Sequence, residues 1–156
     1  MTNSLGFAND HELQIFIGRS NEQHQLATVA KGFGRCLIRI RAVEKITDQT
    51  LLADVARNAY YFDIQEAAVE KITDENFLAD VAKQGDYVKI GRYVDEDQNS
   101  EAHLMAVKKL TIQELLVDVA KNGKYMDACI AAVEKLTDRD ILADLSCFAA
   151  DNDRKP

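Results

Sequence analysis

A seven-residue phrase, AVEKITD, stands at residues 42–48 and returns unchanged at residues 68–74. Looser copies begin at Ala106 and Ala132, and a second phrase, LADVAK or a close variant, recurs in step with the first. Successive copies of the first phrase are 26, 38 and 26 residues apart, so the period is 26 residues with one interruption of 12. Periods of about 20 to 50 residues are typical of stacked units that bury their apolar faces only against one another.

Each unit contains two amphipathic patterns, which predict two helices. Residues 47–59, TDQTLLADVARNA, place leucine, valine and alanine at every third or fourth position, as in a half-buried helix that we call the A helix. Residues 62–72, FDIQEAAVEKI, carry apolar side chains over a wider arc, which predicts a B helix with neighbours on more than one side. A unit of 26 residues accommodates one antiparallel pair of such helices.

Small and polar residues also recur at fixed places in the units. An alanine in every B helix is small enough to let neighbouring helices approach closely. A threonine before each A helix is expected to cap its N–H groups, and TIQE at residues 111–114 has the pattern of a capping box. Gly85 and Gly123 are expected to end A helices in the left-handed conformation. The alanines are Ala42, Ala68, Ala106 and Ala132, and the threonines are Thr47, Thr73, Thr111 and Thr137.

The leucine-rich A helix and the alanine-valine pair of the B helix resemble HEAT-like and armadillo-like α-solenoids, particularly the short bacterial forms, and more distantly the leucine-rich repeat variant. The resemblance covers residues 20–150 and implies an all-α curved stack whose B helices line the concave side and hold a protein partner. The chain lacks the regular proline and arginine of longer HEAT units. The expected single domain, 1–156, comprises an N-terminal cap (1–20), four repeats (21–46, 47–72, 73–110 and 111–136), a terminal half-repeat (137–150) and a tail (151–156).

Charge and apolar content limit the classes of function. The chain of 156 residues is 47% hydrophobic and 29% charged, which suits one soluble domain. No window approaches the roughly 20 apolar residues of a membrane helix, and no secretory leader is recognisable, so we expect a cytoplasmic protein. The formal net charge of −7 disfavours nucleic acid as a partner, because phosphate binding needs clustered lysine and arginine.

Signals of catalysis or metal binding are weak. Cys36, Cys129 and Cys147 lack the spacing of a disulfide framework or a metal site, and they are expected to be small buried residues. The histidines are unclustered, and no nucleophile elbow, phosphate-binding loop or zinc-binding helix motif occurs. We therefore expect no enzyme, no cofactor and no metal site.

An aspartate recurs on the A helices, at Asp54, Asp80, Asp118 and Asp144. In the first three it is followed three residues later by a cation, Arg57, Lys83 or Lys121, which predicts ion pairs within each helix. Packed helices lie about 8 to 10 Å apart, so these carboxylates would not converge on one metal ion.

Several exposed positions are candidates for contact with a partner. The outward row of the B helices is mostly acidic and would favour a basic or polar partner. Tyr61, Tyr87 and Tyr125 recur at the turn from A to B, where they either pack the turn or form a contact edge. The 12-residue insertion adds a tyrosine at its base and acidic residues at its tip. The candidate partner-binding residues are Glu44, Glu66, Glu70, Lys108, Glu134, Tyr87, Tyr93, Asp95, Glu96 and Asp97.

Together these features predict a non-catalytic scaffold that binds a protein or peptide on its concave or ridge surface. Two alternatives remain open: a self-assembling structural repeat protein, and a HEAT-like enzyme acting on nucleic acid or a pigment. Neither nucleic acid nor a membrane is expected as a partner. The last A helix lacks a B partner, and its open side could support a weak end-to-end dimer, so the expected state is a monomer or such a dimer.

In the full chain the third B helix is expected to begin at Glu101, after the insertion. Removing residues 91–102 would join Ile90 directly to His103 and restore the 26-residue period. Loop length costs little stability, so the shortened chain should keep its helical circular dichroism and cooperative melting. If the insertion supplies specificity, the shortened chain should lose the partner that affinity capture recovers with the full chain. Unchanged recovery would contradict that role, and an unfolded product would contradict the repeat register.

Overall fold

The computed structural model describes residues 10–32, 34–83, 101–138 and 141–143. All regular secondary structure in these ranges is helical, which confirms the predicted all-α class. No helix there is long and apolar enough to cross a membrane. The helices are α1 (Asp10–Arg19), α2 (Gln23–Gly32), α3 (Cys36–Lys45), α4 (Gln49–Asn58), α5 (Phe62–Lys71), α6 (Glu75–Lys83), α7 (Glu101–Lys109), α8 (Gln113–Asn122) and α9 (Met126–Lys135).

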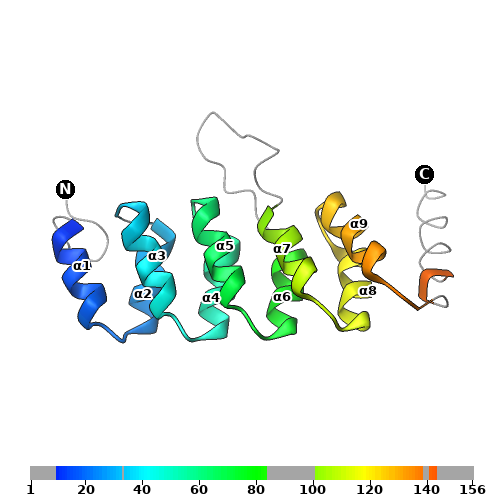
Figure 1. Cartoon of the computed structure of the whole chain (residues 1–156), viewed down its shortest axis with the longest axis horizontal. Helices are drawn as coiled ribbons and strands as arrows, with labels where there is room; N and C mark the ends of the chain where they lie inside the picture. Colours follow the sequence, from blue (N-terminus) through cyan, green and yellow to red (C-terminus); the bar gives the residue numbers. More distant parts are fainter. Residues whose placement is uncertain (1–9, 33, 84–100, 139–140, 144–156) are drawn as a thin grey trace, which may run out of the picture.

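The helices pack as consecutive pairs that follow one another in a row (Figure 1). α2, α4, α6 and α8 take the place of the A helices, and each contacts the B helix that follows it, α3, α5, α7 or α9. Each helix also contacts its counterpart in the next pair, so the A helices form one layer and the B helices a second. α1, in the predicted N-terminal cap, extends the B layer because it packs against α3.

Equivalent apolar residues of successive pairs form the core. The recurring alanines of the B helices, Ala42, Ala68, Ala106 and Ala132, are all 0% exposed, as expected where neighbouring helices meet. The A helices contribute leucines at equivalent positions, Leu26, Leu52, Leu78 and Leu116, which are at most 2% exposed. Full burial of one leucine contributes about 1.5 to 3 kcal/mol, so this core supplies most of the cohesion between the two layers.

A lysine at the end of each B helix binds the end of the preceding B helix. Lys109 Nζ donates hydrogen bonds of 2.7 to 2.8 Å to the carbonyl oxygens of Val69, Glu70 and Ile72. Lys45, Lys71 and Lys135 bind the last carbonyls of α1, α3 and α7 in the same way. These carbonyls lack the N–H partner that a continuing helix would supply, although the valine carbonyl in α3, α5 and α7 accepts one bond from the backbone N–H three residues later. Their partial negative charge attracts a cation. We call these four residues the lysine row.

The first residue of each A helix binds the turn that leads into the next A helix. Gln49 Oε1 accepts a hydrogen bond of 2.8 Å from the backbone N–H of Thr73, and Gln23 and Gln113 accept equivalent bonds from Thr47 and Thr137. Glu75 replaces glutamine in the third pair and accepts from both the hydroxyl and the backbone N–H of Thr111. These bonds hold the pKa of the Glu75 carboxyl below its usual value.

The predicted threonine caps are wrong, because the threonines already bind the preceding pair. Asp48 is the N-cap of α4, and its side chain accepts from the backbone N–H groups of Thr50 and Leu51. α8 begins after Ile112 without a side-chain cap, so TIQE does not form a capping box. Gly123 ends α8 with a φ of −66°, which is not left-handed, and Gly85 lies outside the described residues.

A row of polar side chains lies on the core-facing side of the B helices; its first three members are buried and its last is half-buried. Its members occupy equivalent positions: Arg39, Gln65, His103 and Cys129. Gln65 donates a hydrogen bond of 2.7 Å to the carbonyl of Ala59 in the turn between the A and B helices, and Arg39 and Cys129 bind the corresponding turns of their own pairs. His103 packs on the Tyr125 ring with 4.1 Å between ring centroids. Burial lowers the pKa of His103 to about 4, against a smaller opposing effect of Asp127.

His103 should make the free energy of unfolding depend on pH. Its pKa is lower in the folded chain, so its contribution is fully present above pH 6.5 and is lost as the pH falls toward about 4. At pH 4 the free energy of unfolding should be about 3 kcal/mol lower than above pH 6.5 because of this one group. His103→Gln introduces the residue that the preceding pair has at the equivalent position, Gln65. In this variant the free energy of unfolding in urea should change less between pH 7 and pH 4 than in the wild type. The exposed control His24→Gln should follow the wild-type curve. Parallel curves for His103→Gln and the wild type would contradict this role.

Lys71 tests the contribution of the lysine row. Lys71→Met keeps an apolar stem and removes the cation from the end of α3, where it binds the carbonyls of Val43 and Glu44. We expect the free energy of unfolding in urea to fall by about 1 to 2 kcal/mol, because hydrogen bonds from a charged donor are lost. Lys108→Met, an exposed lysine in α7, should change it by less than about 0.5 kcal/mol. Equal effects of the two substitutions would show that the lysine row does not link the pairs.

Candidate protein-binding surface

The outer B surface, the side of the B layer that faces away from the A helices, carries the predicted charged row. Glu44, Glu70, Lys108 and Glu134 lie near the C-terminal ends of α3, α5, α7 and α9, and all four are exposed. None of these side chains forms a hydrogen bond or an ion pair with any residue that the structure describes. Glu66, also predicted, is half-buried one turn earlier on α5.

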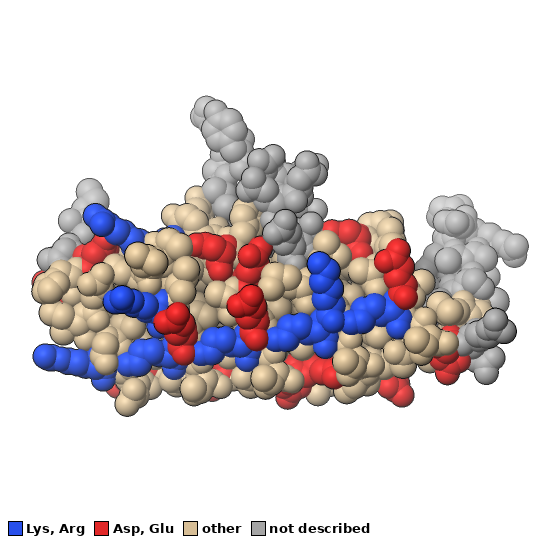
Figure 2. Space-filling model, viewed as in Figure 1, with Lys and Arg blue, Asp and Glu red and all other residues tan. Residues whose placement is uncertain are grey.

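The lysine row lies next to this charged row, and Figure 2 shows basic side chains in a line along the molecule with mostly acidic ones beside it. Burial lowers the pKa of Lys71 and Lys109, and the nearby carboxylates of Glu44 and Glu70 oppose that shift. Lys108 departs from this arrangement. Its backbone carbonyl accepts a hydrogen bond of 2.6 Å from Lys135 Nζ, so two cations lie where the earlier pairs have one cation and one carboxylate.

Apolar side chains are partly exposed next to the charged row. Ile40, Leu104 and Met105 are half-buried, and Ile130 is 51% exposed. One hollow, between α5 and α7, has a volume of about 340 Å³ and is lined by Glu66, Leu104, Met105 and Lys108. A second, between α1 and α3, has a volume of about 300 Å³ and is lined by Gln14, Ile17, Gly18, Arg41, Glu44 and Lys45. The outer B surface therefore offers apolar contact beside exposed charge, as protein interfaces do.

The described members of the tyrosine row pack the turns. Tyr61 lies against Arg39, whose guanidinium carbon is 3.6 Å from the ring centroid, and Tyr125 covers His103. Each of these tyrosines therefore covers the polar core residue of the preceding pair. Tyr125 is only 7% exposed, whereas Tyr61 retains 40% exposure. The remaining predicted contact residues, Tyr87, Tyr93, Asp95, Glu96 and Asp97, lie outside the described residues.

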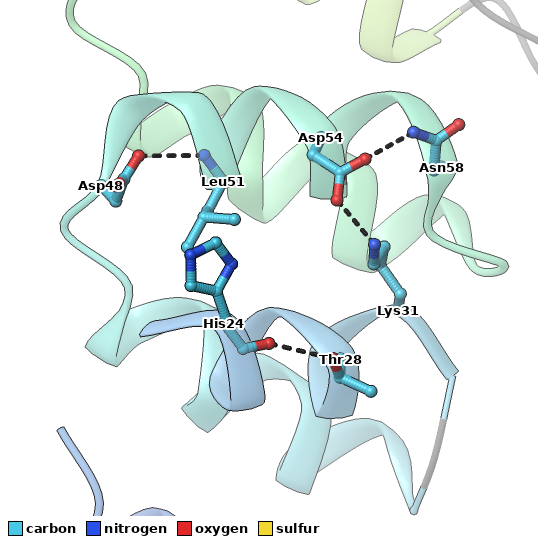
Figure 3. A network of polar contacts seen from close by, with 7 residues as sticks. All are labelled: His24, Thr28, Lys31, Asp48, Leu51, Asp54 and Asn58. Atoms are coloured by element: carbon cyan, nitrogen blue, oxygen red, sulfur yellow. Dashed lines mark hydrogen bonds and ion pairs between the residues drawn. The ribbon is translucent and has the colours of Figure 1, made fainter. Parts of the chain in front are cut away.

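On the outer surface of the A layer, some charged groups form ion pairs between neighbouring helices, as Figure 3 shows for α2 and α4. Lys31 Nζ lies 2.6 Å from Asp54 Oδ2 and joins α2 to α4, and Asn58 donates to the other carboxylate oxygen. Burial raises the pKa of Asp54, but the bonds from Lys31 and Asn58 outweigh it and hold the pKa below its usual value. Lys83 binds Asp118 in the same way and joins α6 to α8.

The prediction of pairing within each A helix is confirmed for α6, and the structure adds ion pairs between successive A helices. An intrahelical contact exists in α6, but Lys83 Nζ is 3.8 Å from Asp80 and closer to Asp118 of the next A helix. The physical reason is that stacking brings the aspartate of the following helix within reach of the lysine. The row therefore links successive pairs as well as forming a contact within α6.

The described thiols are not activated. A hydrogen bond to Asp63 raises the pKa of Cys36, and burial raises the pKa of Cys129. Both shifts oppose formation of the thiolate, which is the nucleophilic form. Within the described ranges, no group of three or more His, Cys, Asp and Glu side chains is placed to hold a metal ion.

The resemblance to HEAT-like and armadillo-like proteins rests on the repeated phrases and on the helix pairs that they encode. Comparisons of the chain with protein-family models, with curated proteins and with solved structures give no significant match. The resemblance therefore stays a prediction, and the surfaces described above are the basis for a functional proposal.

Proposed function

We propose that the chain is a non-catalytic scaffold, a single α-solenoid of 26-residue repeats with one 12-residue insertion, that binds a protein or peptide on its outer B surface. The stacking of α2–α3, α4–α5, α6–α7 and α8–α9 supports a solenoid, because each pair contacts the next through both layers. Such a stack provides an extended surface whose side chains can vary without disturbing the core.

One contrast between the two outer surfaces supports the choice of the B side. On the A side, Lys31 and Lys83 are engaged by Asp54 and Asp118 of the following helix. On the B side, the acidic side chains Glu44, Glu70 and Glu134 are exposed and make no bond with the described part of the chain. Exposed charges without a hydrogen bond or ion pair in the fold are available to bind a partner.

The apolar content of the outer B surface supports a macromolecular partner. Leu104 and Met105 line a hollow beside Lys108, and Ile130 is exposed further along the layer. Burial of such side chains supplies affinity, and the surrounding charges supply orientation and rate of association. Three of the four residues in the charged row are carboxylates, and the neighbouring lysine row is bound to backbone carbonyls. The charged row therefore favours lysine or arginine on the partner segment opposite it.

Selection of random peptides displayed on phage tests this function. Peptides enriched on the immobilised chain should be basic, and fluorescence anisotropy should show about tenfold weaker binding to Glu44→Lys/Glu70→Lys, because two attractions become repulsions. Glu22→Lys/Glu114→Lys is the matched control, since it changes the formal charge equally at two exposed positions outside the B helices. Circular dichroism should show equal helicity for all variants.

The proposal fails if no peptide is enriched. It also fails if the enriched peptides bind both double variants equally well, because the outer B surface would then have no special part in recognition.

A further inference from the structure

The charged row of the outer B surface has a defined order. It reads acidic, acidic, basic, acidic along α3, α5, α7 and α9, at Glu44, Glu70, Lys108 and Glu134. The B helices contact one another in this sequence, so the four side chains are successive steps along one line. A partner that follows the line would meet opposite charges in the order basic, basic, acidic, basic.

The sign change at Lys108 is reinforced by its surroundings. Lys109 and Lys135 lie at the ends of α7 and α9, and Lys135 Nζ binds the backbone carbonyl of Lys108 itself. At α3 and α5, one lysine instead lies near each exposed carboxylate without forming an ion pair: Lys71 near Glu44 and Lys109 near Glu70. An anion on the partner is therefore favoured at the α7 step and opposed at the other steps.

The spacing of the steps limits the conformation of the partner. Packed helices lie about 8 to 10 Å apart, so successive steps are separated by about that distance. A polyproline II segment presents every third side chain on the same side at intervals of about 9 Å, because it rises about 3.1 Å per residue with three residues per turn. A β-strand presents every second side chain on the same side, at intervals of about 6.6 to 6.8 Å. Its side chains would therefore no longer lie opposite the charged residues after two helices.

The hollow beside Lys108 provides the apolar part of the contact. Its lining combines Leu104 and Met105 with the charged ends of Glu66 and Lys108, and its volume of about 340 Å³ admits one side chain of moderate size. A proline or aliphatic residue next to the partner's acidic residue would lie over this hollow. Its burial would add affinity at the same step where the charge defines the position.

We propose that the outer B surface binds an extended, polyproline-type segment with charged residues three apart in the order basic, basic, acidic, basic, read in one of the two chain directions. Lys108 sets the register of the segment by attracting its single acidic residue. This inference rests on the proposed binding function of the outer B surface. A second copy of the chain fits less well, because antiparallel alignment of two such rows would place Glu44 against Glu134 at both ends.

Four labelled peptides test the register by fluorescence anisotropy: RPPRPPEPPR, its reverse RPPEPPRPPR, the composition-matched control EPPRPPRPPR, and the all-basic RPPRPPRPPR. One of the first two should bind the wild-type chain at least about fivefold more tightly than the matched control, because the control places its acid against a carboxylate and an arginine against Lys108. Lys108→Glu should reverse the order, so that the all-basic peptide binds most tightly. Glu114→Lys, on α8, should leave the wild-type order unchanged.

The outcomes separate this inference from the proposed function. If the matched control binds as well as the ordered peptides, or Lys108→Glu leaves the order unchanged, the register is wrong, although binding through the outer B surface stands. If none of the four peptides binds at millimolar concentration, the polyproline-type partner is wrong, and the phage selection still decides whether the surface binds another kind of segment.

Discussion

The carbonyl groups at the end of each B helix are the constraint on which this stack depends. They lack the N–H partner that a continuing helix would supply, and within one helix pair only a backbone N–H of the following turn binds some of them, as Ile72 N–H binds Val69. The lysine that completes their bonding comes from the next pair, as Lys109 binds the last turn of α5. Gln49 binds the turn before the next A helix, and Lys31 binds Asp54 of the next A helix. Besides the apolar core, three kinds of polar contact therefore join each pair to the next: lysine to helix-end carbonyls, glutamine to the following turn, and lysine to aspartate. These contacts explain why lysine and threonine recur together with the alanines.

The sequence allows the buried part of this arrangement to be predicted. Ala68 and Leu52 are recognisable because burial follows local periodicity, and both are fully buried. The polar links could not be predicted from one unit, since Lys71 and Gln49 look like solvated side chains until the pairs are stacked. The threonine caps failed for the same reason, because the acceptor for Thr73 is Gln49, in the preceding pair. A polar residue that recurs at every period, however, is a signal that stacking employs it.

The candidate surface was predictable to a similar degree. The register identified Glu44, Glu70, Lys108 and Glu134 as equivalent and outward, and the structure places all four at exposed positions. The repeat register alone did not reveal which charged side chains form bonds within the fold. Aspartates recur on the A helices and glutamates on the B helices, yet Asp54 forms an ion pair with Lys31, whereas Glu44 forms no hydrogen bond or ion pair with the described residues. Only the distances between helices distinguish a structural row from an available one.

Two departures from the repeated pattern fall in the same unit, residues 73–110, which also contains the insertion. Glu75 replaces glutamine and still binds the turn at Thr111, so the structural link is kept with a different residue. Lys108 replaces glutamate and has no such link to preserve. Its neighbour Lys109 continues the lysine row with bonds to three carbonyls. Adjacent residues thus obey different constraints: Lys109 is fixed by the geometry of the stack, whereas the Lys108 side chain is exposed and makes no bond with the described residues. If the proposed binding function holds, the one unit whose exposed charge is inverted is where the stack would distinguish one partner segment from another.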